Sequence, residues 1–180
     1  MIDDKKILEG VRLILEGLGV DLNNENFKET PQRYLSFLKE ITQPKITDED
    51  YVRFSSAGNL VIARNIRAYS LCPHHLLPVI YNVNVAYLPK GKVVGISKLA
   101  RMVMDMAGKL MLQEEYTESL ADEIARLTQS NDVMVVVYGK HFCMIMRGVK
   151  QHDSSIVTLS IRGVFENLDV RLETLRLMGD

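Results

Sequence analysis

The sequence predicts an α+β fold in which an antiparallel sheet is covered by paired helices and preceded by a helical appendage. Segments with the two-residue period of strands come in pairs, and segments with the 3.6-residue period of helices come in pairs between them. This order favours an antiparallel sheet over a parallel one, in which single strands and helices alternate. The 180 residues are 47% hydrophobic and 25% charged, a composition typical of globular proteins with a sizeable core.

Two helices are expected ahead of the sheet. Apolar residues at helical spacing predict the first over residues 3–18. The segment ETPQRYLSFLKEI predicts the second, with Thr30 as its cap, Pro31 in its first turn and Pro44 as its end. The following residues, up to Gly58, have the composition of a loop. We therefore expect a helical segment over residues 1–44 and a main domain over residues 45–180.

The main domain opens with two expected strands. Residues 59–70 are rich in β-branched side chains, and LLPVIYNVNVAYLPKG predicts a longer strand. Apolar residues alternate in this second strand with Asn82, Asn84 and Ala86, so one of its faces should be buried. The residues on that buried face are Tyr81, Val83, Val85 and Tyr87.

Two helices and further strands complete the chain. GISKLARMVMDMAG predicts a helix with Ser97 as its cap and a stripe of Leu99, Met102, Val103 and Met106. A second helix is expected over about 113–129. DVMVVVY, FCMIMRGV and SSIVTLSIRGVF predict strands, and DVRLETLRLM predicts a closing helix. A sheet this small has exposed edges, so we expect strands to pair across subunits.

Charge and hydropathy exclude several classes of function. The formal net charge is -1, so no overall field would recruit nucleic acid or an anionic membrane. No apolar run reaches the roughly 18 residues that a membrane span needs. The acidic start MIDDKKILEG lacks the apolar core of a signal peptide, which predicts a cytoplasmic protein. In that compartment two cysteines serve more often as thiols or metal ligands than as a disulfide.

The cysteines and histidines are concentrated in two short segments. The chain has two cysteines and four histidines, and SLCPHHL contains Cys72, His74 and His75. Cys72 and His75 stand three apart in an expected turn, where both can reach one ion. Cys143 follows His141 by two residues in KHFCMIMRG, and in a strand these two side chains would share a face. Thiolate and imidazole together suit zinc.

The spacing alone leaves other interpretations open. A single Cys-x-x-His occurs without metal, Cys143 could be a buried core thiol, and His74 could be a solvated loop residue. If zinc binds, four protein ligands would close a structural site, whereas three would leave a position for water.

Several segments, taken in order, resemble the GTP cyclohydrolase I family. They are ETPQRYL, CPHHLLPV, NVAYLPKGKVVGISKLARMV, LQEEYT, HFCMIMRGV, VTLSIRGVF and, more weakly, VRLETL. The resemblance covers nearly the whole chain from residue 30 onward. It implies zinc-dependent conversion of GTP and water to 7,8-dihydroneopterin triphosphate and formate, the first step of tetrahydrofolate and pterin biosynthesis. It also implies the tunnelling fold, in which strands join across subunits into a barrel, and a homodecamer with active sites between subunits.

The resemblance also implies a set of active-site residues. The family's zinc ligands fall on Cys72, His75 and Cys143, and its proton-transferring histidines fall on His74 and His141. These types suit the chemistry, because zinc can activate water at neutral pH and imidazole titrates near that pH.

Substrate contacts follow from the resemblance in the same way. Gln113 and Glu114 match the residues that recognise guanine, and a buried Glu114 would accept hydrogen bonds from guanine N1–H and the 2-amino group. The residues that match the triphosphate-binding positions are Ser97, Lys98, Arg101, Arg147 and Arg33.

Four positions depart from the family pattern: Pro73, Met111, Glu115 and Ile156. They leave room for an altered activity. One alternative is a divergent tunnelling-fold enzyme that acts on a related purine or pterin. The other is a non-catalytic zinc-holding oligomer that binds a nucleotide or a protein partner. The sequence does not assign the downstream pathway.

Overall fold

The structure, a computed structural model, describes residues 2–43, 53–55 and 58–179. The chain divides into two compact units, Met1–Gln43 and Pro44–Asp180. No helix in the described ranges is long and apolar enough to cross a membrane. The expected helix end at Pro44 and most of the expected loop before Gly58 lie outside these ranges.

The N-terminal unit is a pair of helices, α1 (Asp4–Gly17) and α2 (Thr30–Thr42). An Asp3 side-chain oxygen accepts from the Lys6 N–H and caps α1. The prediction that Thr30 caps α2 is wrong. Glu29 occupies the cap position without a side-chain hydrogen bond, and Pro31 lies in the first turn as expected.

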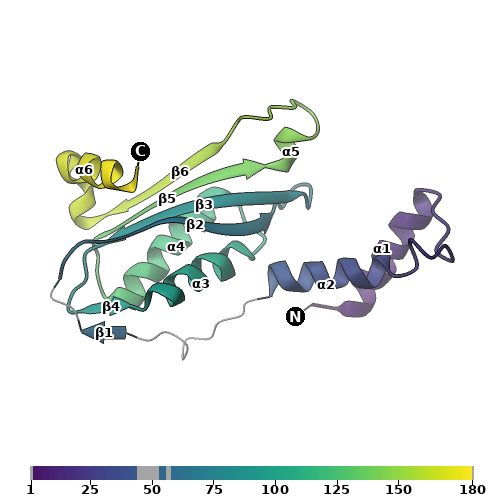
Figure 1. Ribbon diagram of the computed structural model, residues 1–180, viewed down its shortest axis with the longest axis horizontal. Helices are drawn as coiled ribbons and strands as arrows, with labels where there is room; N and C mark the ends of the chain where they lie inside the picture. The colour runs from purple at the N-terminus through teal and green to yellow at the C-terminus, as the bar shows by residue number, and fades with distance from the viewer. Residues whose placement is uncertain (1, 44–52, 56–57, 180) are drawn as a thin grey trace. The chain divides into compact units, whose positions relative to one another are not determined.

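The main unit is built on a four-stranded antiparallel sheet (Figure 1). Its strands are β2 (Val61–Leu71), β3 (Pro78–Tyr87), β5 (Val133–His141) and β6 (Ile156–Arg162), in the spatial order β2-β3-β5-β6. The register pairs Val79 with His141 at one end of the sheet and Tyr87 with Val133 at the other. We call these the Val79 end and the Tyr87 end. The predicted antiparallel α+β architecture is confirmed.

Helices α3 (Ile96–Ala107) and α4 (Gln113–Thr128) cover one face of the sheet (Figure 1). The predicted apolar stripe of α3 is confirmed, and both helices bury apolar residues against the alternating apolar residues of β3 and β5. The prediction that Ser97 caps α3 is wrong. Gly95 takes that position, and no side chain donates or accepts there.

Among the residues that the structure describes, those that cover the other face of the sheet lie near its Tyr87 end. There α6 (Leu168–Met178) and the 3₁₀ turn Gly163–Glu166 bury Ala86, Met134 and Val136 around Phe165. The expectation of one buried face on β3 is therefore incomplete. Asn84 and Ala86 are buried as well, because this second small core lies over them.

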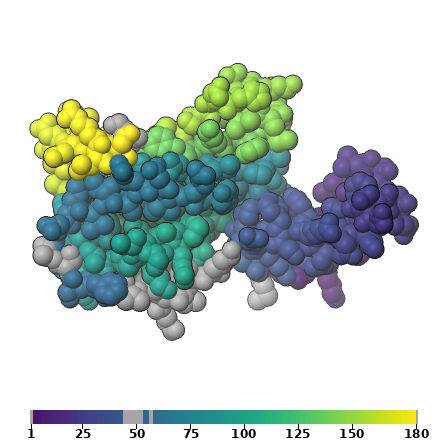
Figure 2. Space-filling model, in the orientation of Figure 1, coloured from purple at the N-terminus to yellow at the C-terminus, as the bar shows by residue number. Residues whose placement is uncertain are grey.

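Two short elements differ from the sequence predictions. FCMIMRGV was expected to form a strand, but α5 (Phe142–Ile145) is a single helical turn that directly follows β5. The connection from α5 to β6 stands out on the surface in green (Figure 2). In the expected loop before Gly58, β1 (Arg53–Ser55) pairs with β4 (Lys92–Val94).

Candidate metal centre and active site

The turn between β2 and β3 holds Cys72 and His75 together. The Cys72 carbonyl accepts from the His75 N–H (3.3 Å) and the Leu76 N–H (2.8 Å), and the Cys72 N–H donates to the Leu77 carbonyl (2.8 Å). Leu76 adopts a positive φ of 52°, which closes the turn. Within this loop Cys72 Sγ lies 3.6 Å from His75 Nδ1.

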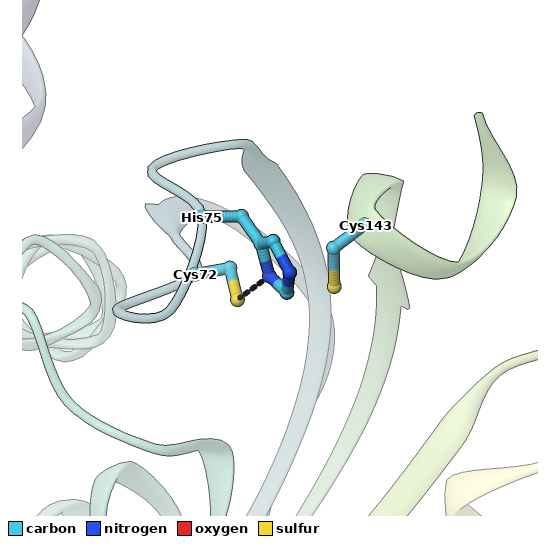
Figure 3. A group of neighbouring side chains, drawn as sticks. All are labelled: Cys72, His75 and Cys143. Carbon is cyan, nitrogen blue, oxygen red and sulfur yellow. Dashed lines mark hydrogen bonds between the residues drawn. The ribbon is translucent and has the colours of Figure 1, made fainter. Parts of the chain in front are cut away.

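Cys143 reaches the same point from α5. Because Val79 pairs with His141, the helical turn after β5 starts beside the loop that precedes β3. The three side chains point toward one another (Figure 3), and their ligand atoms all lie within 4.8 Å of each other. The prediction that His141 and Cys143 share a face of one strand is wrong, since His141 ends β5 and Cys143 belongs to α5. The three residues still converge.

The donor set fits zinc. In a tetrahedral site with bonds of about 2.3 Å to sulfur and 2.0–2.1 Å to nitrogen, a sulfur and a nitrogen ligand lie about 3.6 Å apart. The Cys72 Sγ to His75 Nδ1 distance of 3.6 Å matches this edge. Two thiolates and one imidazole also suit zinc better than magnesium or calcium, which prefer oxygen ligands. Three ligands leave one position open.

Two further side chains border the three ligands. Arg147 is exposed, and its Nη1 lies 2.7 Å from His75 Nε2, the ring nitrogen that is not assigned to the metal. His74 is exposed beside the turn, with Nδ1 3.9 Å from Cys72 Sγ, and its ring meets the edge of the His75 ring. The structure therefore places His74 and Arg147 beside the three candidate zinc ligands.

His141 lies in a more enclosed setting. Its Nε2 is 2.8 Å from Gln113 Oε1, and the ring packs edge-on against Tyr81. Burial lowers the pKa of His141, and the nearby carboxylate of Glu114 acts in the opposite direction. Burial also raises the pKa of Tyr81 to about 12, so Tyr81 stays neutral at physiological pH.

The first turn of α4 brings the two predicted guanine-recognition residues to the Val79 end. Gln113 is buried, with 3% of its surface exposed, and bonds to the backbone of β5 and β6. The neighbouring Glu114 is exposed in the single chain, not buried as the selectivity argument supposed.

The expected triphosphate residues on α3 lie elsewhere. The Val94 N–H donates to the Tyr87 hydroxyl (3.3 Å), which fixes the start of α3 near the Tyr87 end. A ten-residue strand separates that end from the metal ligands by about 30 Å. Within one chain, the residues at the start of α3 therefore do not meet the metal ligands; they are Ser97, Lys98 and Arg101. Arg33 is exposed on α2 in the N-terminal unit.

Sequence reasoning overlooked the residues that surround His141. Tyr81 was expected to be a core residue only, and Gly139 and Thr158 were not singled out. Gly139 carried a usable signal, because a glycine inside a strand often marks a close approach of neighbouring groups. The side chains of Gln113 and His141 make that approach here.

Comparisons with known proteins agree with these features. The GTP cyclohydrolase I family model matches residues 7–179. GTP cyclohydrolase 1 of Hyperthermus butylicus is 44% identical over 165 residues, covering 92% of this chain and 85% of that protein. GTP cyclohydrolase 1 of Clostridium perfringens is 40% identical over 184 residues, covering 99% of this chain and 100% of that protein.

A solved structure shows the same fold. The apo archaeosine synthase QueF-Like superposes with a TM-score of 0.50 at 22% identity, covering 60% of this chain and 97% of that one. At this identity the likeness concerns the fold alone.

Proposed function

The chain belongs to the GTP cyclohydrolase I family, and we propose that Cys72, His75 and Cys143 hold the zinc ion that its reaction requires. The activity is the conversion of GTP and water to 7,8-dihydroneopterin triphosphate and formate. The observation that carries the assignment of ligands is their convergence within 4.8 Å in a chain that matches the family almost end to end.

Zinc, when bound, lowers the pKa of a coordinated water and so supplies a nucleophile near neutral pH. The remaining work falls to the chain's own side chains. Water must add at guanine C8 while N7 gains a proton, and a second hydrolysis releases C8 as formate. We assign these proton transfers to His74 and His141, which border the ligand group from two different elements.

Glu114 is our candidate for guanine recognition. It lies in the first turn of α4, close enough to His141 for its charge to act on that ring. A carboxylate can accept hydrogen bonds from both N1–H and the 2-amino group of guanine, a pair of donors that adenine lacks. Its exposure in the single chain leaves it accessible to a base.

We infer that the triphosphate is bound between subunits. Arg147 lies beside the metal ligands, whereas Ser97, Lys98 and Arg101 lie near the opposite end of the sheet. A neighbouring chain that presents its own α3 could bring the two groups together, and the first-turn N–H groups of α3 would favour an anion. Arg33 is a further candidate cation for this role, because ETPQRYL resembles the family segment that contains such an arginine.

Formate release tests the activity. We expect the purified protein to release formate from GTP and to release far less from ATP, because the site is built for guanine. A mass of the pterin product should match dihydroneopterin triphosphate. Formate from another purine nucleotide but none from GTP would support the divergent enzyme instead, and no formate from any of them would support the non-catalytic oligomer.

The sheet predicts a ring-shaped oligomer. Strands β2 and β6 are the two edges, and β6 exposes Val157 and Leu159. Edges of this kind are usually covered, and edge-to-edge pairing would close the sheet into a barrel. We expect light scattering to report a homo-oligomer of ten subunits, as in the family. A stable monomer with full activity would contradict both the oligomer and the active site between subunits.

A further inference from the structure

We propose that Gln113 is a positioning residue for His141: it fixes the imidazole with its hydrogen on Nε2 and leaves Nδ1 as the atom that exchanges protons with the substrate. The inference rests on the proposed function, in which His141 transfers protons. It gives Gln113 a different task from the guanine contact that the family resemblance implies.

The orientation of the Gln113 amide is fixed by its surroundings. Gln113 Nε2 lies 3.0 Å from each of three acceptors, the Val137 carbonyl, the Ile156 carbonyl and Thr158 Oγ1. A backbone carbonyl can only accept a hydrogen bond, so two of these partners require the amide nitrogen on their side. Rotating the amide by 180° would set its oxygen against two carbonyl oxygens. Oε1 must therefore face His141.

Two threonines complete a chain of hydrogen bonds with one consistent direction. The Thr117 hydroxyl donates to the Gln113 carbonyl (2.8 Å). Thr117 Oγ1 and Thr158 Oγ1 are 2.6 Å apart, and since the Thr117 hydrogen is already used, Thr158 donates to Thr117. Thr158 Oγ1 is then left to accept from Gln113 Nε2. The hydroxyls thus support the same amide orientation as the backbone carbonyls.

The amide orientation determines the tautomer of His141. An amide oxygen only accepts, so His141 Nε2 must carry a hydrogen and donate it to Gln113 Oε1 over 2.8 Å. In a neutral imidazole the lone pair is then on Nδ1. This hydrogen bond uses Nε2 alone, so Gln113 can hold the ring in one orientation while Nδ1 is left without a contact to the amide. The edge-on contact with the Tyr81 ring also restricts the rotation of the His141 ring.

Gly139 provides the space for this contact. It lies two residues before His141 in β5, so both face the helices. A Cβ at this position would overlap Gln113 Oε1, and it would stand 2.9 Å from Gln113 Cδ and 3.0 Å from His141 Nε2. Gly139 does not have a positive φ, so the backbone itself does not require glycine there. The hydrogen bond between Gln113 and His141 does require it.

The burial of Gln113 separates its role from that of its neighbour. With 3% of its surface exposed and both ends of the amide engaged, the side chain has little left to offer a base. Glu114, one residue later, is exposed. Two consecutive residues of one helical turn would thus have different tasks. Gln113 would orient the imidazole of His141, and Glu114 would bind guanine.

A double-mutant cycle tests the proposal. Gln113→Met keeps the length of the side chain but removes the amide oxygen that accepts from His141 and the amide nitrogen that donates to β5 and β6. We expect kcat for GTP to fall roughly 10- to 100-fold, a part of the 10²–10⁴-fold that a general acid–base contributes, while KM changes little. In the His141→Ala background the same change should cost no further kcat. A KM increase of equal size in both backgrounds would overturn the proposal, since it would mean that Gln113 binds the substrate directly.

Milder variants keep the test decisive if Gln113→Met fails to fold, which zinc content and thermal unfolding would reveal. Gly139→Ala should displace only the far end of Gln113 and should lower kcat in the wild-type background but not in His141→Ala. Thr158→Ser, which keeps the hydroxyl, should lose less kcat than Thr158→Val. Wild-type kcat in Gly139→Ala would contradict the proposal. No formate release by the wild type would instead overturn the proposed function.

Discussion

Replacing Cys72, His75 or Cys143 with alanine is expected to abolish both zinc binding and formate release. The three ligand atoms converge within 4.8 Å, and two remaining ligands cannot hold the ion with comparable strength. Apparent binding free energies are on the order of 10 kcal/mol for protein zinc sites of this kind, and each ligand accounts for a large share. Metal analysis of the purified variants, measured beside GTP turnover, checks the expectation.

His74→Ala and His141→Ala are the matched controls, because they lie beside the ligands but are not assigned to the metal. They should keep zinc and the fold and should lose turnover roughly 10²–10⁴-fold, as expected for a general acid or base. If His74→Ala lost zinc while His75→Ala kept it, the roles of the two neighbouring histidines would be reversed. Full turnover in both controls would remove their assigned role.

Glu114→Gln is expected to lower kcat/KM for GTP by roughly 10²–10³-fold, because an amide offers one acceptor where the two guanine donors need two. The same change should reduce the preference for GTP over ITP, since inosine lacks the 2-amino group. Initial rates with both nucleotides measure the two effects. Glu114 lies at the start of α4, so the change should leave zinc content and oligomeric state as they were.

Glu115→Gln provides the matched control. It removes one charge from the same helical turn, and a glutamine can still accept the hydrogen bond that Glu115 Oε2 receives from the Leu112 N–H (3.2 Å). We expect its kcat/KM for GTP to stay within about twofold of wild type, as is usual for a surface charge of this kind. An equal loss in both variants would indicate that the charge of the turn matters, and would contradict guanine recognition by Glu114.

The strands and helices of the main domain could be predicted because their apolar periods are long and regular. The caps of α2 and α3 could not, because Thr30 and Ser97 each have the residue type of a cap but lie one or more positions inside the helix. The single turn of α5 could not be predicted either. FCMIM has the composition of a strand, and only the end of the β5 ladder at His141 stops it from continuing as one.

The ligand set could be predicted in composition but not in geometry. The sequence pointed to Cys72, His75 and Cys143 through the family resemblance, and the structure brings them together by the pairing of Val79 with His141. The hydrogen bond between Gln113 and His141 could not be predicted from the sequence, because it joins a helix start to a strand end 28 residues away. Of the positions that depart from the family pattern, Glu115 accepts a hydrogen bond from the Leu112 N–H at the start of α4. Ile156 contacts Gln113 through its backbone carbonyl, which any residue would supply.

The most direct measurement follows formate release from GTP as zinc is returned to protein stripped with a chelator. The account predicts that the stripped protein is inactive and that the rate rises in proportion to bound zinc up to one ion per chain, held by Cys72, His75 and Cys143. Full formate release from protein that contains no metal would contradict it.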